Sequence, residues 1–237
     1  MSSTSARTER KSVSVLRDGA LQRSAARRSG ESLEDSRPYH HGNLRDELIR
    51  CGKQRLKNGE GPDLSLRQIA ADAGVSQVAP KHHFGNKEGL LAAIAASGFR
   101  DLTEFRYSRI KPSMNAEQRL RVMLAAYVQF AVLNPALFHL MFSPQFKPQD
   151  HAELMESASQ SYQLLYRAAV DFLKESGRGK NNPTAADDAA RMGWISMHGM
   201  ATLLMEHRIN PLGAPRYRPE ALLERTLDMV FAGIRTL

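Results

Sequence analysis

The chain has 237 residues, of which 42% are apolar and 24% charged, a composition typical of a soluble globular protein and unlike a disordered or disulfide-stapled chain. Its single cysteine, Cys51, excludes a disulfide within the chain and fits a reducing compartment, so we expect a cytoplasmic protein. The net charge of +8 favours a polyanionic partner. Six of these charges lie in the first 110 residues and two in the remaining 127, so a polyanion would approach the N-terminal half.

Residues 1–38 are rich in Ser, Arg and Ala and show no helical or alternating period, which predicts a disordered basic arm. The arm has no apolar stretch of the kind that a secretory signal needs, and its five acidic residues argue against a mitochondrial presequence. Its arginines could follow a phosphate track or a minor groove of DNA. The alternative is a solvated tail.

Helical signals begin at Asn43, which is predicted to cap a first helix that ends near Asn58. Ser65 and Gln68 have the spacing of a capping box and predict a short second helix. This helix is expected to end at Gly74, because glycine reaches a positive φ at little cost.

Ser76 is predicted to cap a third helix over residues 77–83, and Pro80 predicts that this helix is short or irregular. Asn86 is predicted to cap a fourth helix. The second and third helices are joined by the tight turn Ala-Gly-Val-Ser at residues 73–76, as in a helix-turn-helix unit. A generic helical hairpin would show similar spacing.

Three runs in residues 39–91 carry a more specific signal: Tyr-His-His-Gly-Asn-Leu-Arg, Leu-Ser-Leu-Arg-Gln-Ile-Ala-Ala-Asp-Ala-Gly-Val-Ser and Pro-Lys-His-His-Phe-Gly-Asn-Lys-Glu-Gly-Leu-Leu. In this order and spacing they resemble the DNA-binding domain of TetR/AcrR-family transcriptional regulators. Residues 134–142 (Asn-Pro-Ala-Leu-Phe-His-Leu-Met-Phe) and 194–199 (Trp-Ile-Ser-Met-His-Gly) resemble the C-terminal domain of the branch named WHG.

The resemblance implies an all-α fold with an N-terminal three-helix helix-turn-helix DNA-binding domain and a helical ligand-binding and dimerisation domain. With the arm at 1–38, we place these domains at 39–88 and 89–237. The resemblance further implies a ligand-responsive regulator, most often a repressor. Such a regulator binds a palindromic operator as a homodimer and leaves the DNA when a small, largely apolar effector binds. The alternative is a DNA-binding structural or division factor with the same fold that acts through a protein partner without a small effector.

In this interpretation the third helix enters the major groove, where the donor and acceptor pattern distinguishes all four base pairs. Gln77 could pair with adenine and Lys81 with guanine or a phosphate, although tyrosine is usual in the family at the position of Lys81. His83 could instead pack beneath Phe84. The predicted DNA-binding residues are Ser65, Ser76, Gln77, Val78, Lys81, His82, His83 and Lys87.

Residues 122–142 carry no charge over 21 positions, which is long enough for a membrane span. Asn134-Pro135 interrupts the run, so we predict a kinked pair of buried helices and no membrane partner. The uncharged residues 192–205 predict a central helix, and an apolar stripe from Leu154 to Phe172 predicts another. By the resemblance, the helices at about 184–209 and 218–236 would pair with those of a second subunit.

Aromatic and methionine side chains of the C-terminal region could line an effector pocket, and the alternative is that they form ordinary core. The predicted ligand-binding residues are Phe130, Phe138, Met141, Phe142, Tyr162, Tyr166, Trp194, Met197 and His198. The sequence contains no G-x-S-x-G, G-x-G-x-x-G, P-loop or H-E-x-x-H motif and no common metal-ligand spacing. We therefore expect no enzymatic activity, no metal and no cofactor.

Overall fold

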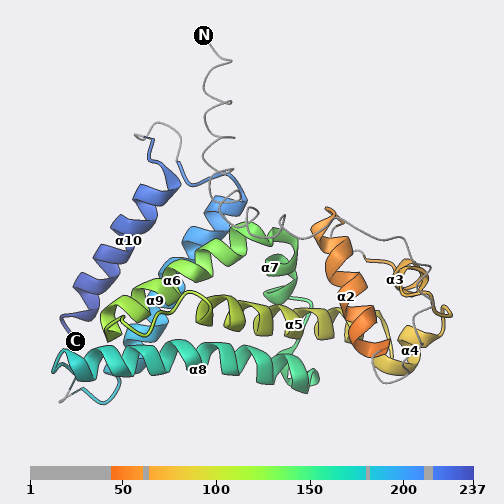
Figure 1. Ribbon diagram of the computed structural model, residues 1–237, viewed down its shortest axis with the longest axis horizontal. Coiled ribbons are helices and arrows are strands. Elements are labelled where there is room, and N and C mark those ends of the chain that lie inside the picture. Colours follow the sequence, from red (N-terminus) through yellow and green to blue (C-terminus); the bar gives the residue numbers. More distant parts are fainter. Residues whose placement is uncertain (1–43, 61–63, 180–181, 211–215) are drawn as a thin grey trace, which may run out of the picture.

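The computed structural model describes residues 44–60, 64–179, 182–210 and 216–237, and every regular element in these ranges is helical. The elements are α2 (Leu44–Lys57), α3 (Leu66–Asp72), α4 (Ala79–Phe84), α5 (Lys87–Tyr107), α6 (Ala116–Leu133), α7 (Pro135–Met141), the 3-10 helix η2 (Pro148–Asp150), α8 (Ala152–Glu175), α9 (Ala185–Met205) and α10 (Pro219–Ile234). Helices α2, α3 and α4 lie together at one end of the molecule and α10 lies at the other (Figure 1). The predicted all-α fold class is confirmed.

The first helices form where local signals predict them. α2 buries Leu48, Cys51 and Leu56 along one face, which explains the helical spacing of these residues. α3 begins after Ser65, whose side-chain oxygen accepts a hydrogen bond of 3.4 Å from the backbone N–H of Gln68. The predicted cap of α2, Asn43, and the predicted arm at residues 1–38 lie outside the described residues.

α4 begins two residues later than predicted. Its N-cap is Val78, with no side-chain cap hydrogen bond, so the prediction that Ser76 caps this helix is wrong. The physical reason is Pro80, which lacks the N–H that would bond to the carbonyl of Ser76. Helical bonding starts instead with the N–H groups of Lys81 and His82, which donate to the carbonyl of Val78 at 3.0 and 3.3 Å. The prediction that the third helix is short is confirmed, since α4 has six residues.

α5 runs from the helix-turn-helix end into the C-terminal region, where it packs against α6, α7 and α8 (Figure 1). It begins at its predicted cap, Asn86, whose side-chain oxygen accepts a hydrogen bond of 2.8 Å from the N–H of Gly89. Further along α5, a Cβ at Gly98 would lie 2.7 Å from Sδ of Met141 and 3.1 Å from Cδ1 of Leu137. The missing side chain at Gly98 therefore lets α7 pack directly on α5. The predicted domain boundary at 88/89 falls in the first turn of α5.

The uncharged segment 122–142 forms most of α6 and all of α7, which bend by 111° at Asn134. The prediction of a kinked pair of helices is confirmed, and Pro135 occupies the first turn of α7, where its missing N–H is tolerated. Among the described helices, none is by itself long and apolar enough to cross a membrane. Only α6 and α7 taken together pass that test, by length and composition.

The remaining helices complete the C-terminal region. α8 packs along α5 and α6, and the predicted stripe is confirmed because Leu154, Leu165, Ala169 and Phe172 are buried. α9 packs against α6, α8 and α10. α10 buries Leu227 and other apolar residues against this core but leaves part of its surface exposed.

Candidate nucleic-acid interface and interior cluster

The turn between α3 and α4 fixes how the two helices cross. Gly74 has a φ of +68°, in the region where glycine is favoured, and ends α3 as predicted. The N–H of Val75 then donates to the carbonyl of Ala70 at 3.0 Å, and the Val75 side chain packs against the core. The chain thus reverses within a few residues, which is the geometry of a helix-turn-helix unit.

The predicted DNA-binding residues gather on and around α4. Ser65 is half-buried at the start of α3, and the others, Ser76, Gln77, Val78, Lys81, His82, His83 and Lys87, are exposed. The buried residue of α4 is Pro80, which faces inward. The alternative in which His83 packs beneath Phe84 does not describe the structure, because His83 is exposed and its ring centroid lies 6.2 Å from that of Phe84.

Within the described part of the chain, the side chains of Gln77, Lys81 and His82 make no hydrogen bond or ion pair. Their polar groups are therefore available to an external partner. The ammonium group and the imidazole on α4, together with the amide just before its N-terminus, can donate to phosphates and to base edges.

Basic residues of α2 hold this unit together and attach it to α5. Nζ of Lys53 lies 2.5 Å from Asp101 of α5 and 3.1 Å from Oγ of Ser97. Arg55 binds Asp72 of α3 at 2.6 Å and Glu60 at 2.7 Å. These cations therefore position α2, α3 and α5 rather than adding to a free basic surface.

A second set of ion pairs joins the helix-turn-helix unit to α8, and we call it the junction. Arg45 of α2 pairs with Glu153 of α8, and its guanidinium carbon lies 5.3 Å from the ring centroid of Phe84. The carboxylate of Glu153 also accepts from Arg100 of α5 at 3.0 Å. Just before α8, Nε2 of His151 lies 3.0 Å from Glu88. The start of α8 is thus in direct contact with the elements that position α4.

The interior of the C-terminal region contains an aromatic group that we call the Tyr127 cluster, consisting of Tyr127, Phe138, Phe142, Trp194 and His198. The Tyr127 hydroxyl lies 2.8 Å from Nδ1 of His198 and accepts a hydrogen bond of 3.2 Å from Nε1 of Trp194. The ring centroids of Phe142 and His198 are 4.7 Å apart, and those of Phe138 and Phe142 are 4.9 Å apart. Burial lowers the pKa of His198 and raises the pKa of Tyr127.

The structure brings four of the predicted ligand-binding residues into this cluster, namely Phe138, Phe142, Trp194 and His198. Met141 and Met197 are buried, and Phe130 stacks edge-on against Phe105. Tyr162 instead donates a hydrogen bond of 3.1 Å to Asp187, and Tyr166 is partly buried against the core. In this structure these side chains pack against the rest of the core, so their role in binding a ligand stays a prediction.

Sequence reasoning missed Tyr127, which is at the centre of the cluster, and Arg106, which is 2% exposed at the end of α5. Nη1 of Arg106 donates to the carbonyl of Ser161 at 3.1 Å and lies 3.3 Å from its Oγ. Its guanidinium carbon lies 5.2 Å from the ring centroid of Tyr127. The sequence does contain a signal for the burial of Arg106, because Phe99, Leu102 and Arg106 have the spacing of one helix face.

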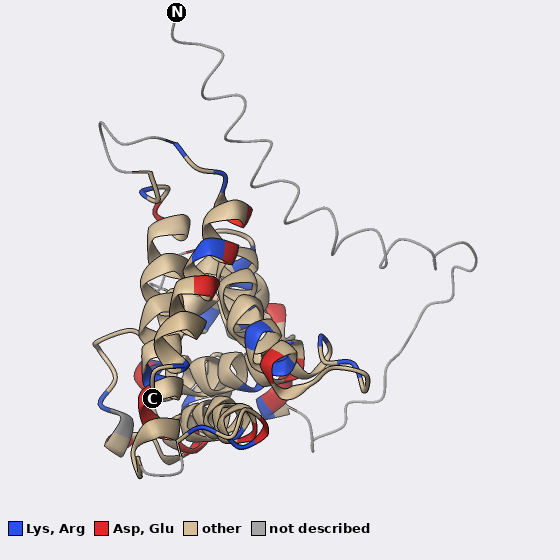
Figure 2. Ribbon diagram, turned by 90° about the vertical axis from the view of Figure 1, so that its left-hand side faces the viewer, with Lys and Arg blue, Asp and Glu red and all other residues tan. Residues whose placement is uncertain are grey.

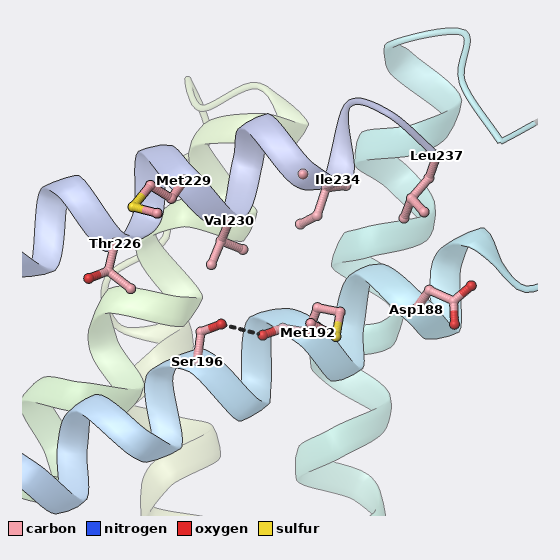
Figure 3. Close-up of a pocket in the computed structure, with 9 residues that line it drawn as sticks. Asp188, Met192, Ser196, Thr226, Met229, Val230, Ile234 and Leu237 are labelled. Atoms are coloured by element: carbon pink, nitrogen blue, oxygen red, sulfur yellow. Dashed lines mark hydrogen bonds between the residues drawn. The ribbon is translucent and has the colours of Figure 1, made fainter.

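A groove of about 380 Å³ lies between α9 and α10, and none of the nine predicted ligand-binding residues lines it (Figure 3). Val230 points from α10 toward α9, which contributes Met192 and Ser196, and Ser196 donates a hydrogen bond of 2.8 Å to the carbonyl of Met192. The groove walls are mostly apolar. Among the described residues, no group of His, Cys, Asp and Glu side chains has the arrangement of a metal site.

Two family models match the chain. The model described as "Bacterial regulatory proteins, tetR family" matches residues 55–94, and the model described as "Tetracyclin repressor-like, C-terminal domain" matches residues 120–230. The first match contains α3 and α4, and the second contains the Tyr127 cluster and most of the groove. Together they span more than half of the chain.

Solved structures show the same fold. A protein of unknown function from Rhodococcus sp. RHA1 is 31% identical, with a TM-score of 0.67, over 84% of this chain and 98% of that one. A tetR-family transcriptional regulator from Streptomyces coelicolor is 20% identical, with a TM-score of 0.59, over 83% of this chain and 84% of that one.

A curated relative is the nucleoid occlusion factor SlmA from Photobacterium profundum. It is 33% identical over 108 residues, which are 42% of this chain and 51% of that protein. The chain therefore spans about half the length of the curated relative that it matches.

Proposed function

Because the chain belongs to the TetR family of bacterial regulatory proteins, we propose that it represses transcription by binding a palindromic DNA operator as a homodimer. A small, largely apolar molecule would bind in the helical C-terminal region and release the DNA. The observation that carries the proposal is the exposed surface formed by Lys81 and His82 of α4 and by Gln77 just before it, whose side chains make no hydrogen bond or ion pair within the described residues. A short exposed helix that follows a helix-turn-helix turn can enter a major groove of DNA.

The groove between α9 and α10 supports dimerisation through these helices. Met192, Ile195 and Met229 are 56%, 54% and 76% exposed, which is unusual for large apolar side chains on two neighbouring helices. Seen from the end that carries α10, basic and acidic residues lie close together, so neither sign dominates this side (Figure 2). A second copy of the same surface would cover the apolar residues without placing like charges together over a large area.

The dimer can be tested by sedimentation of the full chain at micromolar concentration. We expect a dimer, and we expect Met229→Lys to shift it toward monomer because a charge would be buried in the interface. Met155→Lys is the matched control, since Met155 is 51% exposed on α8. A monomeric wild-type protein, or equal effects of the two variants, would contradict the proposal.

The junction supports a route from an effector to DNA. Glu153 at the start of α8 contacts both Arg45 of α2 and Arg100 of α5, so a displacement of α8 would be felt by the helices that position α4. The protein would have one arrangement of α8 that binds DNA and another that does not. An effector that binds the second arrangement a few kcal/mol more tightly than the first is enough to shift the protein into it.

The central test is selection of bound sequences from random duplexes by the full chain, combined with genomic footprinting. We expect one enriched palindrome whose half-sites lie about one helical turn apart. Deletion of the protein should raise transcription beside the footprinted site. If no sequence is enriched over bulk DNA, the proposed function is wrong.

A second candidate function is a DNA-binding structural or division factor that acts through a protein partner without a small effector. The similarity to the nucleoid occlusion factor SlmA supports it. The same footprinting separates the two functions. Many scattered sites, with no change in neighbouring transcripts on deletion, would favour this second candidate over the repressor.

A further inference from the structure

Arg106 is a buried cation without a counter-ion. Its side chain is 2% exposed, and among the described residues no carboxylate pairs with it. Other arginines near the same helices do have acidic partners, as Arg100 has with Glu153 and Arg119 has with Glu175. A buried charge that lacks an opposite charge is strongly disfavoured, so its presence calls for a physical reason.

The hydrogen bonds of Arg106 are also incomplete. A guanidinium carries five N–H donors, and here Nη1 contacts Ser161 whereas Nε is buried and has no hydrogen-bond partner among the residues that the structure describes. Burial lowers the pKa of Arg106 to about 10, with only the neighbouring Tyr127 acting in the opposite direction. The group still carries its charge at neutral pH, so an interior positive charge with a free donor remains.

A purely structural role explains part of this arrangement. A cation in the last turn of α5 is favoured by the helix dipole, and the contact with Ser161 ties α5 to α8. However, the guanidinium turns into the interior toward the ring of Tyr127 and leaves Nε unsatisfied. A structural tie between two helices needs neither a net charge nor a spare donor at that depth.

The surroundings indicate what kind of molecule would complete this site. The guanidinium lies against the ring of Tyr127, and the Tyr127 hydroxyl forms hydrogen bonds with His198 and Trp194. The other members of the cluster are phenylalanines, so the surroundings of the charge are aromatic. We propose that the effector of this protein is a carboxylate attached to an apolar body, and that its carboxylate pairs with Arg106 while the body replaces contacts of the Tyr127 cluster. This inference rests on the proposed function and deepens it, because it assigns a charge to the effector.

The cluster must open for such a molecule to enter. Its side chains are packed together here, but Phe142, Trp194 and His198 are only partly buried, so they can separate at lower cost than the fully buried Phe138. Arg106 bridges α5 to Ser161 of α8, which lies about two helical turns from the junction residue Glu153 on the same helix. A carboxylate that draws the guanidinium away from Ser161 would therefore act on the helix that contacts the DNA-binding unit.

The test compares decanoate with decanamide, which has the same apolar chain without the charge. Trp194 is the single tryptophan of the chain, so its fluorescence reports binding at the cluster. We expect the full-length protein to bind decanoate at least about tenfold more tightly than decanamide, as charge-assisted hydrogen bonds require. The preference for decanoate over decanamide should vanish in Arg106→Gln and persist in part in Arg106→Lys. Ser161→Ala leaves the guanidinium intact and should keep the full preference.

Equal affinities of the wild-type protein for the two compounds, or no binding of either, would overturn the inference without any need for a variant to fold. A preference that survives in a folded Arg106→Gln protein would overturn it as well. The measurement uses no DNA, whereas the proposed function is tested by selection of DNA sequences in the absence of effector. Failure of this inference is therefore distinguishable from failure of the proposed function.

Discussion

The surface around α4 and the Tyr127 cluster both carry side chains that can form hydrogen bonds, but they hold them in opposite settings. On α4 and in the turn just before it, the polar groups of Gln77, Lys81 and His82 face solvent without partners in the described chain. In the cluster, the polar groups of Tyr127, Trp194 and His198 bond to one another inside an aromatic core. The first arrangement offers its hydrogen bonds to another molecule, and the second uses them within the fold.

This contrast separates binding from stability. Substitutions on α4 should weaken binding to DNA and leave the free energy of unfolding nearly unchanged, because little packing is lost. Substitutions in the cluster should lower the free energy of unfolding, because packing and internal hydrogen bonds are lost together. Arg106 combines both properties, since it is buried like the cluster and unsatisfied like α4.

The largest expected effect is that of Tyr127→Ala, which removes a fully buried ring from the centre of the cluster. We expect the free energy of unfolding, measured in urea, to fall by about 3–5 kcal/mol. Tyr127→Phe keeps the ring but leaves Trp194 and His198 without their shared partner, and should cost about 1 kcal/mol. Tyr107→Ala, at a residue 55% exposed on α5, is the control and should stay within about 0.5 kcal/mol. Equal losses for the two alanine variants would mean that the cluster is not tightly packed.

The next effect concerns the double variant Gln77→Ala/Lys81→Ala. At about 1–3 kcal/mol for each contact, the loss of two contacts amounts to about 2–6 kcal/mol in each half-site, so affinity for the selected operator should fall by roughly 30-fold to 25,000-fold. The slope of log affinity against log salt should also become shallower by about one for each Lys81 that contacts a phosphate. The free energy of unfolding should change by less than about 0.5 kcal/mol.

The control for this variant is Lys111→Ala/Gln163→Ala, which removes the same two residue types at exposed positions of the C-terminal region. We expect it to leave the operator affinity unchanged. If both double variants weaken binding equally, α4 is not the element that reads DNA, and the contrast between surface helix and interior cluster fails.

The helix-turn-helix unit could be predicted because its signals are local. Ser65, Gly74 and Asn86 each act within four residues of their own position: Ser65 and Asn86 accept the hydrogen bonds of helix caps, and Gly74 has a positive φ after α3. The start of α4 was predicted two residues early, because Ser76 is a favourable cap by itself and the effect of Pro80 on the first helical bond overrides it.

The interior could be predicted only in part, because it depends on contacts between residues far apart in the chain. Composition and spacing selected Phe138, Phe142, Trp194 and His198, but nothing local shows that Tyr127 is the residue on which they converge. Arg106 was missed for a related reason. An arginine in the last turn of a helix is usually a solvated cap, and only the packing of α8 onto α5 buries it.

The smallest expected effect is the pH dependence contributed by His198. The Tyr127 hydroxyl accepts from the indole N–H of Trp194, which can only donate, and it can also donate its own proton to Nδ1 of His198 when the imidazole is neutral. Because burial lowers the pKa of His198 in the folded state, its contribution to stability is present above the unfolded pKa of about 6.5 and is lost as the pH falls through the lower folded value.

The variant His198→Gln cannot take up a proton in this pH range. The loss of unfolding free energy between pH 7.5 and pH 5 should therefore be smaller in this variant than in the wild-type protein, by less than about 1 kcal/mol since the ring is only partly buried. An identical pH dependence in both proteins would show that the interior cluster tolerates a charged imidazole, and that it is less closed to solvent than its hydrogen bonds indicate.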